Sequence, residues 1–428
     1  MFPSEFINGM EETLGRERSQ RVLSALTAEP EVSVRVNPFK WTVGELRAHF
    51  GGLAAEAVPW AEGEAFYLSQ RPSFTLDPCF HAGAYYVQEA SSMYAGCLFD
   101  EAFAALGRPA GLRVLDLCAA PGGKTTQLLS HAGPGALVVA NEVVPSRATV
   151  LAENVARWGC AGSVVTRSDP SAFTRLRGFF DLVVTDVPCS GEGMFRKDAR
   201  AVAEWSPAAV QHCAARQRRI LADVWPALAP GGYLIYSTCT FNRTENEDNV
   251  AWIAGELGAE VVRMRHFYPG EDRGEGFFAA LLRKAGRFVV RSCSVPPEAL
   301  TLCEHRGLLK CFTNVLQKEL PALEKHLAVI ASGTAVAVRK GRDTVPDADY
   351  ALAVRRIPVE GLDFDTVSLS REDALRFLAK EALVFPDQPR GYLLLEYEGL
   401  GLGFVKNLGN RSNNLLPAGR RILHGVGR

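Results

Sequence analysis

Two strings place a cysteine among small and polar residues, each directly after a hydrophobic, strand-like run. They read Asp-Val-Pro-Cys-Ser-Gly-Glu-Gly at 186–193 and Ser-Thr-Cys-Thr-Phe at 237–241. The thiolate is the reactive form of cysteine, and a polar, anion-stabilising loop favours it. Two such thiols in one chain predict covalent catalysis by one cysteine and a second task for the other.

A third string, Leu-Asp-Leu-Cys-Ala-Ala-Pro-Gly-Gly-Lys-Thr-Thr at 115–126, predicts a cofactor loop between a strand and a helix. Glycines let the backbone approach a ligand, and the N-terminus of the following helix favours an anion. The string is not a P-loop, because Cys118 stands where that motif needs glycine. The dinucleotide pattern G-x-G-x-x-G is also absent from the string.

Acidic residues stand at the ends of successive predicted strands and indicate what this loop binds. We expect Glu142 to hold two ribose hydroxyls and Asp169 to hold an adenine amino group. S-adenosylmethionine, which combines a nucleoside with one carboxylate, fits these demands. The alternative is that Gly122 and Gly123 only form a tight strand-to-helix turn.

The two thiols suit chemistry on a pyrimidine. A thiolate that adds to carbon 6 turns carbon 5 into a nucleophile, which can take a methyl group from a sulfonium donor. Loss of the carbon 5 proton and expulsion of the thiolate complete the cycle. We expect Asp186 to stabilise the electron-rich adduct near ring N3 and the exocyclic amine. Spacing alone does not decide which cysteine attacks.

Strands and helices alternate around these strings. Strands are expected at 113–118, 136–140, 164–166, 181–186 and 233–236, and helices from 124, over 145–158 and over 206–228. Buried apolar strands separated by helices indicate a parallel sheet with both faces covered. Ligands bind such a sheet at the carboxyl ends of its strands, where the three strings lie. We expect residues 277–283 to close the sheet edge.

Length and charge set the frame. The chain has 428 residues, 47% of them hydrophobic, so two or three globular domains are expected. The net charge is −1, but residues 285–428 hold 20 basic and 16 acidic side chains, a net of +4. Such a segment suits contact with phosphates, although a solvated basic terminus explains the charge equally well.

The ten cysteines lack a dense framework and a close Cys-x-x-Cys pair, so we expect reduced thiols and a cytoplasmic protein. The first residues have no signal-peptide pattern, and no apolar run is long enough to span a bilayer. His81, His131 and His212 show no metal-ligand spacing. We therefore expect no metal and no membrane partner, and a monomer by default.

The three strings resemble the motifs of the Sun-family RNA (cytosine-5)-methyltransferases, most closely those of the bacterial RsmF-like branch that modifies small-subunit ribosomal RNA. Residues 117–125 resemble the family's cofactor motif, 186–197 its Pro-Cys motif and 236–241 its Thr-Cys motif. Residues 35–38 and 88–92 resemble two further family segments. Residues 403–414 resemble the C-terminal RNA-binding region.

The resemblance implies an α/β fold: a Rossmann-like class I S-adenosylmethionine-dependent methyltransferase core with a seven-stranded, mostly parallel sheet. It also implies an order of domains along the chain. These are a small N-terminal α/β RNA-contacting domain (1–76), the catalytic domain (77–284), a connecting region (285–370) and a PUA-like RNA-binding domain (371–428).

The resemblance further implies residue roles. Cys239 would be the nucleophile and Cys189 would assist breakdown of the covalent adduct. Asp186 would contact the cytosine and the methionine end of the cofactor, with Lys124 also near the target. The residues expected to bind the cofactor are Cys118, Ala119, Ala120, Pro121, Gly122, Gly123, Lys124, Glu142, Arg147, Asp169 and Asp186.

Basic and amide side chains near the motifs are candidates for RNA contact. We expect Arg196 and Lys197 to contact phosphates, because they follow the Pro-Cys motif directly. Arg35 and Asn37 either touch RNA or brace the N-terminal segment. The expected RNA-binding residues are Arg35, Asn37, Gln88, Arg196, Lys197, Lys406 and Arg411.

The sequence thus predicts methylation of carbon 5 of cytosine in structured RNA, with small-subunit (16S) ribosomal RNA favoured by the resemblance. Transfer RNA is an alternative substrate. A methyltransferase for a protein or small molecule would have no use for Cys189 and Cys239 together. A non-catalytic RNA-binding assembly factor is a further alternative, which the intact strings oppose.

Overall fold

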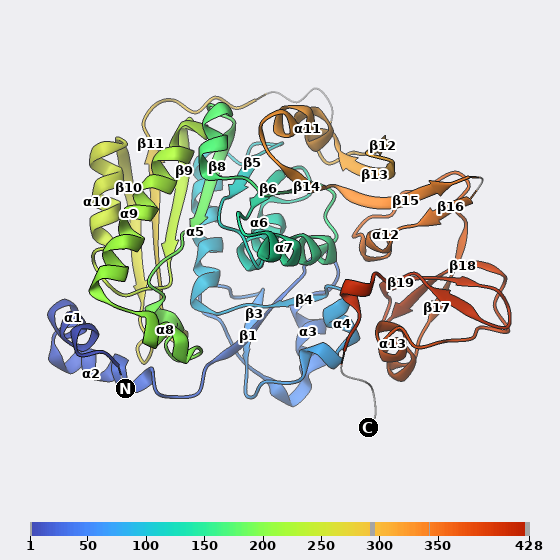
Figure 1. Ribbon diagram of the computed structural model, residues 1–428, viewed down its shortest axis with the longest axis horizontal. Coiled ribbons are helices and arrows are strands. Elements are labelled where there is room, and N and C mark those ends of the chain that lie inside the picture. Colours follow the sequence, from blue (N-terminus) through green and yellow to red (C-terminus); the bar gives the residue numbers. More distant parts are fainter. Residues whose placement is uncertain (1, 292–295, 342, 424–428) are drawn as a thin grey trace.

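A computed structural model of the chain describes residues 2–291, 296–341 and 343–423 (Figure 1). Residues 292–295, 342 and 424–428 of the two expected C-terminal segments lie outside this description. The central feature is an eight-stranded sheet of order β10-β11-β9-β8-β5-β6-β7-β14. Its strands are β5 (Arg113–Asp116), β6 (Leu137–Asn141), β7 (Ser163–Thr166), β8 (Phe180–Asp186), β9 (Leu228–Thr238), β10 (Ala259–Phe267), β11 (Phe277–Lys284) and β14 (Val329–Ser332).

Strands β5 to β9 run parallel, whereas β11 is antiparallel to both β9 and β10. The predicted doubly wound core is therefore confirmed. Two features differ from expectation. Strand β11 lies inside the sheet, and β10 forms the edge that residues 277–283 were expected to close. At the other edge β14 pairs antiparallel with β7 and adds an eighth strand from the connecting region.

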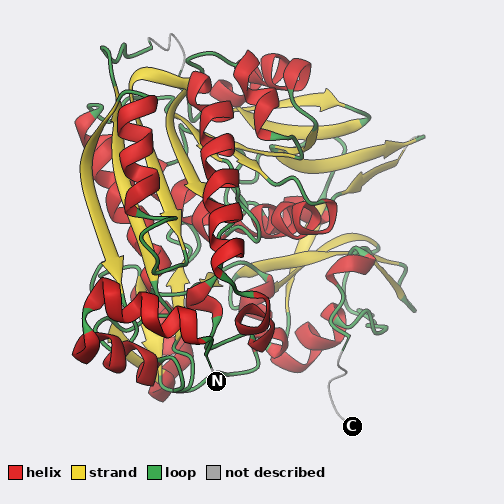
Figure 2. Ribbon diagram, turned by 60° about the vertical axis from the view of Figure 1, so that its left-hand side comes forward, coloured by secondary structure: helices red, strands yellow, loops and turns green. Residues whose placement is uncertain are grey.

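Helices cover both faces of this sheet (Figure 2). One face packs against α5 (Tyr94–Ala105), α6 (Gly123–Ala132) and α7 (Pro145–Trp158), and the other against α9 (Pro207–Val224), α10 (Glu247–Glu256) and α11 (Asn314–His326). Strand residues alternate between the two cores, as Val114 and Leu115 show. Helix α9 begins where Ser206 Oγ accepts a hydrogen bond from the Ala209 N–H, with Pro207 at its first position.

The N-terminal region begins with two helices and continues into a second sheet of order β2-β3-β1-β4. This sheet runs past residue 76, because β4 pairs with β1. A short helix, α8, lies between β8 and α9 in the catalytic region. The bounds are α1 (Ser4–Leu14), α2 (Arg16–Ala25), β1 (Val32–Val36), α3 (Val43–Phe50), β2 (Ala54–Ala57), β3 (Ala65–Leu68), α4 (Pro78–His81), β4 (Tyr85–Val87) and α8 (Ala199–Glu204).

Two further four-stranded sheets follow the catalytic core, of order β12-β13-β15-β16 and β17-β18-β19-β20. Helix α11 buries Leu316, Leu320 and Leu323 in one of the two cores of the catalytic sheet. Helix α11 and strand β14 of the expected connecting region thus pack with the catalytic sheet, whereas β12, β13, β15 and β16 form a sheet of their own. The bounds are β12 (Leu300–His305), β13 (Leu308–Thr313), β15 (Thr334–Lys340), β16 (Asp343–Pro346), α12 (Ala348–Leu352), β17 (Phe364–Ser368), α13 (Arg371–Leu378), β18 (Gly391–Tyr397), β19 (Leu400–Asn407) and β20 (Ser412–Asn414).

The last sheet and the N-terminal sheet share one apolar core, which includes Leu46 and Phe66 from one side and Leu375 and Leu393 from the other. Segments at opposite ends of the chain therefore lie side by side, as α4 and α13 do in Figure 1. Among the described residues, no helix combines the length and apolar character that a bilayer crossing requires.

Candidate active site

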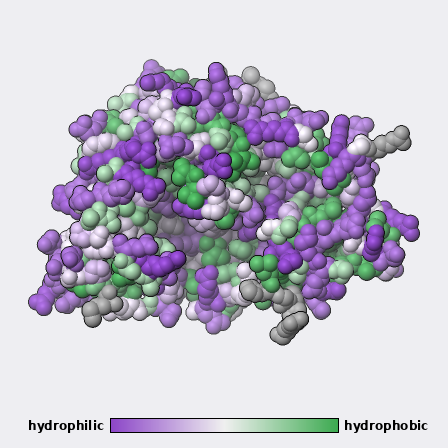
Figure 3. Space-filling view, viewed as in Figure 1, coloured by the Kyte–Doolittle hydropathy of each residue, from purple (hydrophilic) through white to green (hydrophobic). Residues whose placement is uncertain are grey.

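A cleft lies between the carboxyl ends of the central strands and the N-terminal sheet. Its lining combines the loop after β5, the end of β8, Cys239 after β9, and Phe277 at the start of β11. The N-terminal sheet contributes Tyr86 and adjoining residues. The surface is hollowed between α8 and this sheet (Figure 3). The three strings therefore meet at the carboxyl ends of the parallel strands, where a ligand was expected to bind.

The loop after β5 is held from behind by α7. Arg147 donates to the Ala120 carbonyl at 2.9 Å, and Asn154 donates to the Pro121 carbonyl at 2.8 Å. Gly122 has φ of +114°, and a Cβ there would meet Leu151 at 3.3 Å. A side chain at this position is therefore strained, which explains the glycine before α6. Arg147 holds the loop and is not among the cleft-lining residues.

Asp116, at the end of β5, is a site residue that the sequence analysis missed. It is fully buried, and its Oδ2 accepts a hydrogen bond from the Thr125 hydroxyl at 2.6 Å. Its Oδ1 has no hydrogen-bond partner within the described part of the chain. Burial raises the pKa of Asp116 to about 7. An unpartnered carboxylate oxygen beside the cleft suits a cationic group of a ligand.

Glu142 and Asp169 follow β6 and β7 as predicted, but neither lines the cleft itself. Glu142 is buried, and its Oε1 accepts from the Val144 N–H at 2.9 Å, which leaves Oε2 at 3.5 Å from Arg147. Asp169 is more than half exposed and caps the short helix that follows by accepting from Ser171. These hydrogen bonds lower the pKa of Asp169, so its carboxyl group is ionised at neutral pH.

The two motif cysteines meet although 50 residues separate them. Their Sγ atoms are 3.2 Å apart, because β8 and β9 are parallel neighbours and both loops leave the same sheet edge. The Gly193 N–H donates to the Cys239 carbonyl at 2.8 Å. A Cβ on Gly193 would lie within 3.1 Å of three carbonyl oxygens, which explains this glycine. The hydrogen bond to Cys239 and burial both raise the pKa of Cys189, which therefore stays a thiol.

Two buried carboxylates that the sequence analysis did not single out fasten the cysteine loops to each other. Glu192, in the first loop, accepts from the backbone N–H groups of Phe241 and Asn242 at 2.6 and 3.0 Å. Glu245, after the second loop, accepts from the Ser190 N–H and from Gln217 at 3.0 and 2.7 Å. We call Glu192 and Glu245 the carboxylate clamp. Glu192 lies three residues after Cys189, and Glu245 lies six residues after Cys239. This short spacing in the sequence was a signal from which both carboxylates could have been predicted.

An ion pair lies beside the thiols. Lys124 Nζ is 2.8 Å from Asp186 Oδ2, and the Ser237 hydroxyl donates to Asp186 Oδ1 at 3.0 Å. Burial alone would lower the pKa of Lys124, but the attraction of Asp186 outweighs it and the net pKa is raised. Lys124 is therefore a fixed cation next to Cys239 and above the ring of Phe277, with Nζ 4.9 Å from the ring centroid.

Four of the expected RNA contacts are internal instead. Arg35 is fully buried, donates to Gln88 and Thr126 at 2.8 and 2.7 Å, and stacks on Trp158. Asn37 is fully buried and donates to the carbonyls of Gly83 and Trp158. These two side chains brace the N-terminal sheet against the catalytic core, so the bracing alternative is correct for them. Gln88 is also largely buried and accepts a hydrogen bond from Arg35, but part of it borders the cleft.

Arg196 is the fourth internal residue. Its guanidinium is 2.6 Å from Glu275, donates to the Gly274 carbonyl, and has a side chain only 6% exposed. It therefore holds the loop before β11 and is not free for phosphate. Lys197, its neighbour, is partly exposed, lines the cleft and lies 3.6 Å from Glu275. Lys406 pairs with Asp343 at 2.6 Å, and Arg411 lies exposed on the last sheet.

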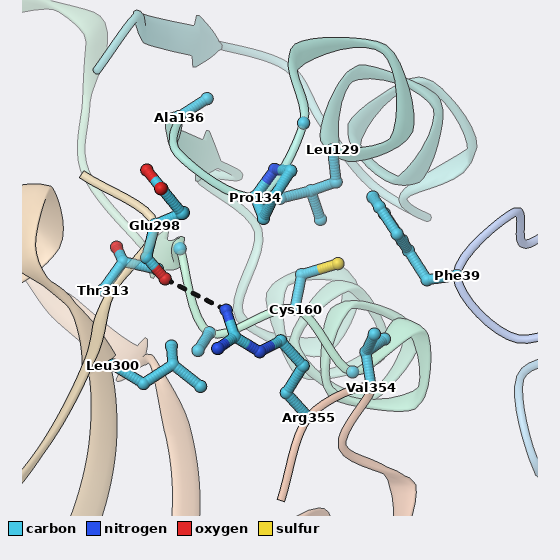
Figure 4. A pocket seen from close by; sticks show the side chains of 14 residues that line it. Phe39, Leu129, Pro134, Ala136, Cys160, Glu298, Leu300, Thr313, Val354 and Arg355 are labelled. Atoms are coloured by element: carbon cyan, nitrogen blue, oxygen red, sulfur yellow. Dashed lines mark hydrogen bonds between the residues drawn. The ribbon is translucent and has the colours of Figure 1, made fainter. Parts of the chain in front are cut away.

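A groove continues from the cleft along the N-terminal sheet. The two share Val87, Gln88, Glu89 and Lys197, and the groove adds both basic and acidic side chains: Arg71, Arg196, Arg273, Glu29 and Glu31. Another pocket lies near the opposite, amino ends of β6 and β7, where Phe39, Leu129 and Pro134 form apolar walls (Figure 4). Arg355 donates there to the Glu298 carbonyl at 3.2 Å. This pocket shares no lining residue with the cleft that contains Cys239.

Comparison with known families agrees with this geometry. The profile of the family described as "16S rRNA methyltransferase RsmB/F" matches residues 105–283. The "N-terminal domain of 16S rRNA methyltransferase RsmF" matches residues 2–90, and the "Methyltransferase RsmF PUA domain" matches residues 364–422. The chain belongs to the RsmB/F methyltransferase family. The cofactor of this family is S-adenosylmethionine, as expected.

Curated relatives carry the same family name. The "Ribosomal RNA small subunit methyltransferase F" of Pectobacterium atrosepticum is 35% identical over 324 residues, which is 69% of this chain and 64% of that protein. Its namesake from Salmonella paratyphi A is 36% identical over 309 residues, which is 66% of this chain and 63% of that protein. The aligned part of the chain thus spans less than two thirds of the length of these relatives.

Two solved structures share the fold. A methyltransferase homologue from Pyrococcus horikoshii aligns with a TM-score of 0.58 and 29% identity, over 66% of this chain and 95% of that one. NSun6 from Pyrococcus horikoshii, crystallised with SFG, aligns with a TM-score of 0.56 and 18% identity, over 67% and 99%. The methyltransferase fold expected from the sequence is confirmed.

Proposed function

We propose that this chain methylates carbon 5 of a cytosine in structured RNA, with 16S ribosomal RNA favoured, through a covalent adduct between Cys239 and the base. The observation that carries the proposal is the pair of thiols 3.2 Å apart beside the Lys124–Asp186 ion pair. The family profile, the PUA match and the names of the relatives support RNA as the substrate.

The cleft fits S-adenosylmethionine. Asp116 Oδ1, buried and unpartnered among the described residues, suits the ammonium of the methionine end, and Gly123 lines the cleft with no side chain between the backbone and a ligand. Residues 118–124 hold that end. The nucleoside extends beyond the cleft toward the ends of β6 and β7, where Glu142 Oε2 takes the ribose and Asp169 the adenine. When bound, the cofactor supplies an electrophilic methyl group on a sulfonium.

The residues of the chain perform the remaining steps. The Cys239 thiolate forms a bond to carbon 6 of the cytosine, and Lys124, a fixed cation, stabilises the thiolate before attack. Asp186 accepts a hydrogen bond from the exocyclic amine of the base, and its ion-pair partner Lys124 offsets the electron density that moves toward N3. Once carbon 5 carries the methyl group, it loses its proton to solvent. The electron pair of that C–H bond forms the double bond to carbon 6 as the bond from carbon 6 to Cys239 breaks. Cys189 assists that release from its position against Cys239.

Such attack requires the base to leave its stack, because carbon 6 of a paired cytosine is out of reach of a thiol. The groove that continues from the cleft, with Lys197 and Arg71 on its walls, offers a path for the adjoining backbone. Arg273 also lines the groove but is paired with Glu31 and Glu56. The PUA region adds affinity for structured RNA.

The test uses the Cys189→Ala chain, total RNA and S-adenosylmethionine, with separation on a denaturing gel. We expect a covalent protein–RNA band, and sequencing of the attached RNA identifies the target, 16S or transfer RNA. The band should vanish when Cys239 is also replaced by alanine. Cys213→Ala, a half-buried cysteine on α9, is the matched control and should give no band. A band that persists without Cys239 would refute the nucleophile assignment.

A further inference from the structure

A third cysteine takes part in a cluster whose residues do not line the cleft. Cys79, at the start of α4, lies with its Sγ 3.5 Å from Glu398 Oε2. His49, near the end of α3, places Nδ1 3.9 Å from the same oxygen. The three ligand atoms all lie within 4.8 Å of one another. Glu398 stands in the turn between β18 and β19, so the cluster joins the N-terminal domain to the PUA region.

These distances suit a tetrahedral metal ion. Bonds of about 2.0–2.3 Å from Zn²⁺ to nitrogen, oxygen and sulfur set ligand atoms roughly 3–4 Å apart. A thiolate, an imidazole and a carboxylate form a mixed set that favours zinc over magnesium or calcium, which prefer oxygen alone. The half-exposed Glu398 side chain leaves one side of the cluster open for a water as fourth ligand.

Asp77 supplies the support that a metal-bound histidine needs. Its Oδ2 lies 2.8 Å from His49 Nε2, and its Oδ1 accepts from the Cys79 N–H at 2.9 Å. A proton on Nε2, held by Asp77, leaves the lone pair of Nδ1 directed toward the cluster. Metal-binding histidines commonly have such a carboxylate behind them. Tyr85 donates a hydrogen bond to the same Asp77 oxygen and fixes it in turn.

The backbone at Glu398 is a separate sign that its position is constrained. Glu398 has φ of +49° and Gly399 φ of +75°, which are the angles of a tight hairpin turn. Glycine, asparagine and aspartate are preferred at such angles, and a glutamate is unfavourable there. The turn nonetheless places the Glu398 carboxylate against Cys79 and His49.

We propose that His49, Cys79 and Glu398 bind one Zn²⁺, with Asp77 orienting His49, and that the ion fastens the PUA region to the N-terminal domain. The elements involved already pack together, because α4 contacts both α13 and β19 and their side chains share one apolar core. The ion therefore fixes an existing contact in a single geometry. The proposal is independent of the chemistry at Cys239.

The test measures zinc in the full-length chain after purification with zinc and removal of loosely bound metal. We expect about one zinc per chain in the unmodified protein, and a stoichiometry near zero in Cys79→Ser and in His49→Gln. Asp77→Asn should keep the three ligands and lower zinc affinity by about tenfold or more. Glu398→Gln, at a half-exposed turn, serves as the ligand variant with the least effect on folding.

Cobalt identifies the sulfur ligand directly. We expect Co²⁺ added to the metal-free chain to give a sulfur-to-cobalt charge-transfer band that Cys79→Ser abolishes. Cys189 and Cys239 place two thiols side by side and could also bind cobalt. The variant with both Cys189→Ala and Cys239→Ala is therefore the control and should keep the band. A band that depends on that pair and not on Cys79, or zinc below a tenth of an equivalent in every protein, would overturn the proposal.

Discussion

The molecule contains two cysteine sites of different kinds. At the cleft, Cys189 and Cys239 each sit in a motif, and parallel neighbouring strands bring the motifs together. At the domain junction, Cys79 has no motif, and its partners His49 and Glu398 lie 30 and 319 residues away in the sequence. Local sequence motifs indicate the first site, whereas the residues of the second come together only when the chain folds. A cysteine with no sequence signal can thus still belong to a site.

The sharpest way to separate the two sites is to remove the nucleophile. We expect Cys239→Ala to lower methylation by at least ~10⁴-fold, because a covalent mechanism has no substitute for the attacking group. The binding of S-adenosylmethionine should stay unchanged, since Asp116 and residues 118–124 are untouched. Measured methyl transfer to RNA and cofactor titration check both parts. Retained turnover would show that the thiol pair is no more than a structural contact.

Breaking the carboxylate clamp tests whether the cleft depends on its loops as well as its thiols. Glu192→Ala leaves the buried N–H of Phe241 without its acceptor. We expect a loss of about 1–3 kcal/mol in the free energy of unfolding and about 10²-fold lower methylation. Denaturant unfolding and initial rates measure the two effects. Glu204→Ala on α8, whose residue is exposed, is the control, and equal losses in both variants would contradict the clamp.

Asp116 gives the cleft a pH dependence. Its pKa in the folded chain is about 7 against 3.8 in a model peptide, because burial disfavours the anion. The group therefore destabilises the fold progressively as pH rises from about 4 to 7. A cationic ligand needs the anion, so affinity for S-adenosylmethionine should rise about tenfold from pH 6 to pH 8. Calorimetric titration at both values checks this, and Asp116→Asn should flatten the dependence.

The sequence predicted most of the central fold, because buried parallel strands and their helices carry strong local patterns. It missed β10, whose residues 260–265 are all exposed and show no alternation between buried and exposed positions, and β14, which comes from a region of weak periodicity. Within the site, the cysteines, Lys124 and Asp186 were predicted from motifs. Asp116 was missed although it stands in the same string, because its role depends on burial, which the string does not reveal.

The RNA contacts show the opposite error. Arg35, Asn37 and Arg196 carry side chains that suit phosphate or base recognition, and the sequence left open whether the first two brace the fold. Burial decides the question, since all three are enclosed and hydrogen-bonded within the protein. Charge type alone did not separate an internal brace from an external contact, because both use the same donors.

The smallest effect belongs to the junction site. If zinc fastens the PUA region to the N-terminal domain, a chelator should lower the Tm of the unmodified chain by about 1 °C, which corresponds to roughly 1 kcal/mol of lost binding in a chain of 428 residues. Glu398→Gln should start at that lower Tm and not respond to the chelator. Thermal unfolding by circular dichroism measures both. A chelator that lowers the Tm of Glu398→Gln equally would place the metal elsewhere. A shift confined to the chain with all three ligands would show that the fold builds a site from residues without a common motif.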